Sequence, residues 1–147
     1  MTPNELDKIL TAHKKWLNNE DEGRRADFRG ADLRHANLYG AALWNADFRG
    51  ADLRYANLYG ANLWNADFRG ADIDYSCWPL WCGSLNVKVD RRIFCQLAYH
   101  LCRVIVDDDD CKEAQLMLGR LANEFHRAAE CGRVPETPKE EQHEPSL

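Results

Sequence analysis

A block of twenty residues occurs twice in immediate succession and then begins a third time. Residues 26–45 read ADFRGADLRHANLYGAALWN and residues 46–65 read ADFRGADLRYANLYGANLWN. The two blocks differ only at the pairs His35/Tyr55 and Ala42/Asn62, and residues 66–73 start the third copy with ADFRGADI. Self-similarity at a fixed period indicates a fold in which each block is one structural unit stacked on the next.

Each block contains a shorter period of five residues. A helix cannot use this period, because five steps of about 100° scatter the apolar residues around the cylinder. A straight strand cannot use it either, because an odd repeat sends successive large residues to opposite faces. The period predicts a coil of twenty residues with four short extended sides, each followed by a corner. Ala recurs every fifth residue from Ala26 to Ala71, and a large inward residue follows two places later: Phe28, Leu33, Leu38, Leu43, Phe48, Leu53, Leu58, Leu63, Phe68 and Ile73.

These units resemble the pentapeptide-repeat family, whose pattern is A(D/N)LXX. Ten consecutive units in residues 26–75 follow the pattern, and Ala42 is the only departure at the Asp/Asn position. The resemblance implies a right-handed quadrilateral β-helix, here of about two and a half coils with about 4.8 Å between coils. We therefore expect a mainly β solenoid, capped by an N-terminal helix and followed by a C-terminal αα-hairpin.

A twenty-residue coil places residue n under residue n+20, so outward side chains form columns. Two sides are expected to carry Arg and Asp, and the other two to carry aromatic residues. Tandem duplication copies outward residues as faithfully as inward ones, so the identity of the columns does not by itself indicate function. A contiguous apolar patch, however, is typical of a surface that contacts a partner or a second copy of the chain. The candidate partner-binding residues are Trp44, Trp64, Tyr39, Tyr59, Arg29, Arg49, Arg69, Arg34 and Arg54.

Residues 1–25 are expected to cap the first coil. Thr2 as N-cap, Pro3 at the first helical position and Glu5 at the capping-box position predict a helix start. Leu6, Leu10, His13 or Trp16, and Leu17 then form one stripe at helical spacing, which favours packing on the coil. His13 is interpreted as a residue of this helix face.

Residues 76–132 are expected to form the helical unit. One helix is predicted from Asp90 to about Val106 and a second from about Asp110 to Glu130, joined by residues 107–110, whose acids favour capping over calcium binding. The first helix is apolar around most of its circumference, which favours burial in a homodimer. Residues 133–147 are rich in Pro and Glu and are expected to be disordered. The candidate dimer residues are Trp78, Trp81, Ile93, Phe94, Leu97, Leu101 and Val104.

Composition excludes several classes of protein. The net charge is −5, and no segment has the basic excess that nucleic-acid binding requires. Residues 1–147 contain neither a long apolar run nor a secretory signal layout, which predicts a cytosolic protein that does not enter a membrane. The six cysteines are then expected to be structural thiols, with zinc as an alternative if Cys77 and Cys82 fold back onto Cys95 and Cys102, and disulfides as another.

No catalytic constellation or cofactor motif is evident. The three serines, Ser76, Ser84 and Ser146, have no adjacent base, and there is no phosphate-binding loop. We therefore expect a binding protein without a cofactor.

The sequence is compatible with three candidate functions. The segments HKKWL, CGSL, QLAYHLCR and EFHRAAECG are similar to those of small pentapeptide-repeat proteins of bacteriophages and prophages, which implies inhibition of a host protein or defence system. Other family members mimic DNA and inhibit gyrase, but those proteins are longer and more acidic, whereas this coil balances seven Asp with five Arg. The third function is nucleotide binding, with Trp and Tyr for stacking and Arg for phosphate contacts.

Overall fold

A computed structural model describes residues 1–80, 82–105 and 107–136. The chain divides into two compact units, Met1–Ile93 and a second unit that begins at Phe94. Sequence analysis places this division after residue 75, but the coil continues beyond that point. The side chains of Asp90 and Arg92 also bond to the coil, since Asp90 accepts from the Gly70 N–H and Arg92 donates to the Ala71 carbonyl.

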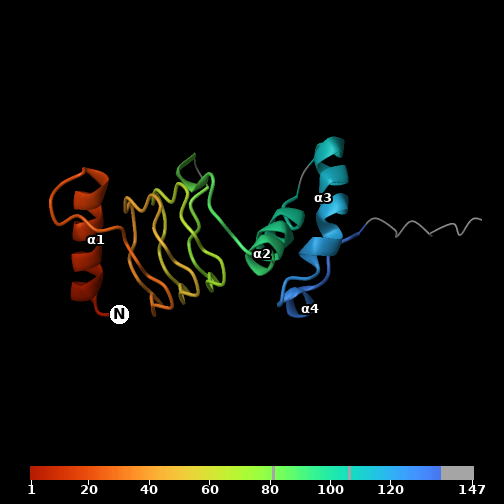
Figure 1. The fold of residues 1–147 in the computed structure, drawn as a ribbon. Coiled ribbons are helices and arrows are strands. Elements are labelled where there is room, and N and C mark those ends of the chain that lie inside the picture. Colours follow the sequence, from red (N-terminus) through yellow and green to blue (C-terminus); the bar gives the residue numbers. More distant parts are fainter. Residues whose placement is uncertain (81, 106, 137–147) are drawn as a thin grey trace, which may run out of the picture. The chain divides into compact units, whose positions relative to one another are not determined.

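Helix α1 (Pro3–Leu17) begins with the predicted capping box. The Thr2 hydroxyl accepts a hydrogen bond from the Glu5 N–H at 3.3 Å, and the Glu5 carboxylate accepts one from the Thr2 N–H at 2.8 Å. Figure 1 shows α1 against the first turns of the coil, with Leu6 and His13 buried. The predicted N-terminal helix is therefore confirmed; in its predicted stripe Leu6 and His13 are buried, and Leu10, Trp16 and Leu17 are partly buried.

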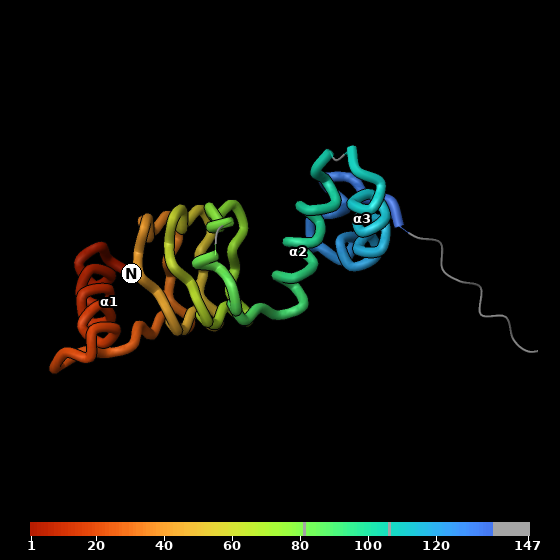
Figure 2. Tube along the Cα trace, turned by 90° about the horizontal axis from the view of Figure 1, so that it is seen from above, coloured from red at the N-terminus to blue at the C-terminus, as the bar shows by residue number. Residues whose placement is uncertain are grey.

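The coil follows the predicted register of twenty residues. Figure 2 shows successive turns of the chain stacked on one another, and each parallel pairing within the repeat joins residue n to residue n+20. The Phe28 N–H donates to the Asp47 carbonyl at 2.7 Å, and the Asp47 N–H donates to the Ala26 carbonyl at 3.1 Å. Because a corner follows every fifth residue, the described residues pair through isolated bridges and form no extended strand. In that respect the expectation of a mainly β chain is wrong, since helices are the longer regular elements.

The corners are tight turns, and in every unit except that of Ala42 an Asp or Asn side chain bonds to the turn. The Ala31 N–H donates to the Phe28 carbonyl at 3.0 Å across Gly30, whose φ of +63° suits the third position of a type II turn. The Asp27 carboxylate accepts from the Arg29 N–H at 3.1 Å, as in an Asx-turn. This bond recurs along the coil and gives the physical reason for Asp or Asn at the second position of each unit.

The interior of the coil is a stack of apolar rings. Phe28, Phe48 and Phe68 are fully buried, with successive ring centroids 4.8 and 4.6 Å apart. Trp78 packs its ring edge-on against Phe68 at 5.2 Å.

The coil runs on to Lys88 rather than stopping at residue 75. Asn57 pairs with Cys77 and Asp67 with Lys88, and a short 3-10 helix, η1 (Cys82–Ser84), lies in this last turn. The Leu63 N–H donates to the Gly83 carbonyl at 2.6 Å. Backbone pairing does not require the repeat motif, so the sequence pattern ends before the coil does.

Helix α2 (Arg91–Cys102) starts where predicted but ends four residues earlier than predicted. The Asp90 carboxylate caps it by accepting from the Ile93 N–H at 3.0 Å. At the other end, the Gln115 side-chain amide donates to the carbonyls of Leu101 and Val104, both at 2.9 Å, and so satisfies the free end of the helix. Helix α3 (Asp109–Ala122) is capped by Asp108, as the acidic run predicts.

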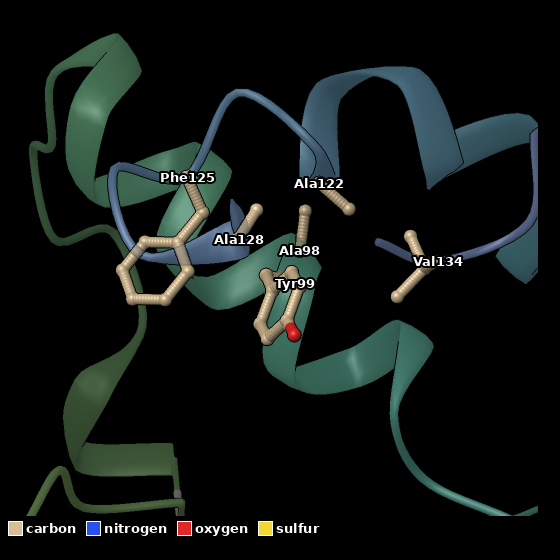
Figure 3. Close-up of a cluster of buried hydrophobic side chains, with 6 residues drawn as sticks. All are labelled: Ala98, Tyr99, Ala122, Phe125, Ala128 and Val134. Atoms are coloured by element: carbon tan, nitrogen blue, oxygen red, sulfur yellow. The ribbon is translucent and has the colours of Figure 1, made fainter. Parts of the chain in front are cut away.

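The second predicted helix is broken after Ala122, and in the described residues up to 136 one short helix, α4 (Ala128–Cys131), follows. The Asn123 side chain causes the break, because it accepts from the Val134 N–H at 2.9 Å and donates to the Val134 carbonyl at 3.0 Å. The chain then folds back to pack Phe125 against Tyr99 at 5.1 Å. Figure 3 shows the resulting buried cluster: Ala98, Tyr99, Ala122, Phe125, Ala128 and Val134.

Residues 133–136 pack against the helices and are not disordered as predicted. Val134 is buried, and a Cβ added to Gly119 would lie only 1.9 Å from the Pro135 carbonyl oxygen. The remainder of the predicted tail, residues 137–147, lies outside the described residues.

Candidate functional site

Two sides of the coil carry Asp and Arg pairs that neutralise one another. On the first side, Arg29 Nε donates to Asp27 Oδ1 at 2.9 Å and Nη2 donates to Oδ2 at 2.6 Å. Such bidentate pairs are the strongest side-chain hydrogen bonds between these groups. The same arrangement joins Arg34 to Asp32, Arg49 to Asp47, Arg54 to Asp52 and Arg69 to Asp67.

These pairs are also linked from one coil to the next. Arg29 Nε lies 3.8 Å from Asp47 Oδ2, and Arg49 Nε lies 3.9 Å from Asp67 Oδ2. The hydrogen bonds from Arg29 lower the pKa of Asp27 to about 2, and those from Arg49 lower the pKa of Asp47. The predicted arginine columns therefore exist, but their guanidinium groups are already engaged by carboxylates.

The other two sides carry the predicted aromatic columns. The rings of Tyr39 and Tyr59 stack at 5.7 Å, and these side chains are 64% and 62% exposed. Trp44 and Trp64 on the next side are 48% and 43% exposed. At the corner that follows, Asn65 donates its side-chain amide to Asn45 at 2.6 Å, which ties the two coils together.

A third aromatic column, which sequence analysis missed, lies at the corner before the tyrosine side. His35, Tyr55 and Tyr75 stack with centroids 5.0 and 4.7 Å apart and planes within 7° and 3° of parallel. Their φ angles are +58°, +61° and +59°, a conformation that costs a residue with a Cβ about 1–2 kcal/mol. The signal was present in the sequence as aromatic rings spaced twenty residues apart at the last position of a unit.

We define the aromatic face as the three columns that follow one another around the coil. In the two columns of stacked rings, each ring covers one face of its neighbour, while the ring edges stay uncovered by these stacks. Ring edges carry partial positive charge and suit carbonyl oxygens and other aromatic faces. The aromatic face consists of His35, Tyr55, Tyr75, Tyr39, Tyr59, Trp44 and Trp64.

The predicted dimer residues do not all lie on the surface. Ile93 is fully buried within the chain and cannot contribute to an interface, while Trp78 is partly buried against Phe68. Leu97 is also partly buried, and Trp81 lies outside the described residues. Exposed apolar side chains do lie on α2, α3 and the loop between them: Phe94, Leu101, Val104, Ile105, Leu116 and Met117.

The cysteines differ from the expectation of buried thiols. All six lie in the described part of the chain and are free, but only Cys95 is buried and Cys102 is partly buried. Cys77 is exposed because it takes the outward position of the coil above Asn57. Across residues 1–80, 82–105 and 107–136, no group of three or more His, Cys, Asp or Glu is placed to hold a metal. The helices of this same part of the chain include none that is long and apolar enough to cross a bilayer.

Among the comparisons with known proteins, the match to a family model supports the repeat assignment. The chain is similar to a solved pentapeptide repeat protein, Rfr23, from the cyanobacterium Cyanothece 51142, at 29% sequence identity and a TM-score of 0.37. This similarity covers 45% of the present chain and only 41% of that chain. No curated protein matches the sequence. The family model for pentapeptide repeats matches residues 26–65 and 46–77 in eight copies, so residues 26–77 are a pentapeptide-repeat segment.

Proposed function

We propose that this chain is a non-catalytic interaction protein that binds another protein through its aromatic face. The proposal rests on a difference between the sides of the coil in how their outward side chains are paired. Carboxylates and guanidinium groups satisfy one another on two sides, whereas Tyr39, Tyr59, Trp44 and Trp64 remain largely exposed on the others. Ordered, exposed aromatic side chains are the residues most often found at the energetic centres of protein interfaces.

The stacking of the rings supports this function. Tyr and Trp present a large rigid area at low cost in conformational entropy, and stacking on a neighbour restricts them further. Tyr55 and Tyr75 are held at positive φ, where glycine or asparagine is the usual residue. Backbone strain of this kind is concentrated at functional sites, which favours a role for the corner column.

The finer form of the proposal is a phage-derived inhibitor of a host protein or defence system. Its support is the resemblance of the flanking segments to small phage and prophage proteins. The aromatic face is consistent with it because a protein inhibitor needs a preformed contact surface.

The two alternatives receive less support from the geometry. A DNA mimic needs unpaired negative charge, whereas the described Asp columns are paired with Arg. A nucleotide needs free guanidinium groups for its phosphates, but the guanidinium groups of both arginine columns are paired with carboxylates. Loss of gyrase supercoiling activity at a hundredfold excess of the protein would favour the mimic. A rise in melting temperature with a nucleotide or cyclic dinucleotide would favour the third function.

Affinity capture tests the proposal. The wild-type protein, immobilised and exposed to a bacterial lysate, is expected to retain a defined protein, identified by quantitative mass spectrometry. A Tyr59→Ala/Trp64→Ala variant is expected to lose that protein. The matched control, Arg49→Ala/Arg69→Ala, alters the neighbouring column and is expected to retain it. Retention of the same protein by the aromatic variant would overturn the proposal.

We also propose that the chain forms a homodimer through the exposed apolar surface of its second unit. Leu101 and Val104 are each more than half exposed and Ile105 is 98% exposed, which is unusual for a group of large aliphatic residues. A stable interface should bury more than about 1,000 Å². Light scattering should then give twice the chain mass of 16.9 kDa. Leu101→Asp should yield monomer and Trp64→Ala should leave the dimer intact, whereas a monomeric wild-type protein at micromolar concentration would refute the dimer.

A further inference from the structure

His13 joins the N-terminal helix to the first residue of the coil. Its side chain is fully buried, and its Nδ1 accepts a hydrogen bond from the Ala26 N–H at 3.1 Å. An imidazole that accepts at Nδ1 is neutral and carries its proton on Nε2. Among the described residues, Nε2 makes no hydrogen bond of normal geometry, although the Trp44 backbone lies close enough to favour the charged imidazole. The contact therefore depends on the protonation state of one buried ring.

The surroundings of His13 oppose a positive charge. Burial lowers the pKa of the imidazole, the Trp44 backbone acts in the opposite direction, and the charge of Arg25 lowers the pKa further. Arg25 enters from the segment after α1 and lies 3.9 Å from the carboxylate of Asp47. From α1 itself, the Trp16 ring stacks on His13 at 5.4 Å, with the planes within 11°.

The segment that follows α1 is packed closely against the backbone of the helix. A Cβ added to Gly23 would lie 2.4 Å from the Trp16 backbone nitrogen. The Arg24 N–H also donates to the Ala12 carbonyl at 3.0 Å, next to His13 in the sequence. These close contacts join the segment to α1 next to His13.

Helix α1 covers the apolar end of the coil. The first coil contributes Phe28, Leu33, Leu38 and Leu43, all at most 2% exposed. An uncovered solenoid end exposes such a cross-section together with unpaired backbone groups, which is why terminal caps are required for solubility. If α1 moves away from the first coil, this apolar surface and these backbone groups become exposed to solvent.

We propose that His13 is a pH-sensitive latch that holds α1 on the first coil when neutral and releases it when protonated. Protonation places an N–H at Nδ1 directly against the Ala26 N–H, so the hydrogen bond is replaced by a donor facing a donor. It also places a full charge in a site with no solvent exposure, beside the cation of Arg25.

The direction of the effect follows from proton linkage. The closed state binds the proton more weakly than the open state, in which His13 has its ordinary pKa of 6.5. Closure is therefore fully stable above pH 6.5 and weakens as the pH falls toward the lower pKa of the closed state. The equilibrium constant for opening should rise by up to about tenfold per pH unit over this range.

Amide hydrogen exchange on the full chain tests the latch. After correction for intrinsic rates, protection of α1 and of Ala26 should fall by up to about tenfold per unit below pH 6.5. Protection of the second coil, residues 46–65, should stay constant. Equal protection of α1 at pH 7.5 and pH 5.0 would overturn the proposal.

Two variants separate the latch from general acid sensitivity. His13→Asn keeps an acceptor for the Ala26 N–H but does not titrate, so protection of α1 should become independent of pH. His35→Tyr installs the residue that the second block carries and should keep the wild-type response. An unchanged acid response in His13→Asn would refute the latch.

Direct titration of the wild-type imidazole provides a readout that does not depend on a folded variant. The nuclear magnetic resonance shift of the His13 ring should titrate below pH 6.5, together with the loss of α1 protection. A His13 pKa at or above 6.5 would contradict the proposal.

Discussion

The charged sides and the aromatic sides of the coil share one backbone but differ in how their outward side chains are satisfied. Both kinds of side use the same corner, in which an Asp or Asn side chain accepts from the N–H two residues later, as in Asp47 with Arg49 and Asn57 with Tyr59. On the charged sides the residue that donates this N–H is an Arg, and its guanidinium group completes a bidentate ion pair with the same carboxylate. On the aromatic sides that residue carries a ring that stays largely exposed.

The two kinds of side therefore differ in which of their outward side chains remain available to a partner. The charged sides contribute to the stability of the coil and leave little unpaired charge for a partner. The aromatic sides leave their rings exposed, as the proposed contact surface requires. The predictions below test whether stability and binding can be separated in this way.

Acid should produce the largest effect, because it titrates the paired carboxylates of the charged sides together. Hydrogen bonds from Arg lower the pKa values of five of them, that of Asp27 to about 2: Asp27, Asp32, Asp47, Asp52 and Asp67. Depressed values mean that their contribution to stability is complete above the unfolded pKa of about 3.8 and is lost as the pH falls through the folded values. The free energy of unfolding from urea titrations should fall between pH 4 and pH 2. A stability that does not change over this interval would show that the pairs contribute nothing.

Asp47→Ala should give the next largest effect. The Asp47 side chain is 5% exposed and accepts hydrogen bonds from the backbone and side chain of Arg49. Removing it should lower the free energy of unfolding by about 2 kcal/mol, since hydrogen bonds to charged groups are each worth more than neutral ones.

The matched control is Asp27→Ala, which removes the same residue type from the first coil. Asp27 is 51% exposed, so solvent screens its pair with Arg29, and the loss should be below about 1 kcal/mol. Equal losses at the two positions would contradict the role assigned to burial.

Tyr55→Gly should have a small net effect on stability. Glycine relieves about 1–2 kcal/mol of strain at a φ of +61°, but the variant loses the stacks with His35 and Tyr75, each worth about 0.5–1.5 kcal/mol. The two terms nearly offset each other, so the free energy of unfolding should change by less than about 1 kcal/mol. A much larger loss would mean that the corner column is mainly a structural element.

The coil was predictable from the sequence almost residue by residue, because one short period sets both the corner and the inward position. Phe28, Phe48 and Phe68 therefore stack where the period places them. The corner column was missed because a corner position is expected to hold Gly or Asn, as Gly30 and Asn45 do. The identity of a corner residue is not specified by the period.

The remaining differences arise from contacts that no local pattern encodes. The coil extends to Lys88 through backbone hydrogen bonds, which do not depend on side-chain type. Helix α3 ends at Ala122 because Asn123 bonds to Val134, eleven residues away. Ile93 has the helical spacing of an interface residue, but it is buried within the chain.

The affinity of the captured partner for two paired variants tests the central claim most directly. Trp44→Ala/Trp64→Ala removes exposed rings from one side, and Arg34→Ala/Arg54→Ala removes the guanidinium groups of another. Isothermal titration calorimetry on folded samples should show the dissociation constant raised by at least about tenfold for the tryptophan pair and by less than about threefold for the arginine pair. The reverse order would contradict the account and assign binding to the charged sides.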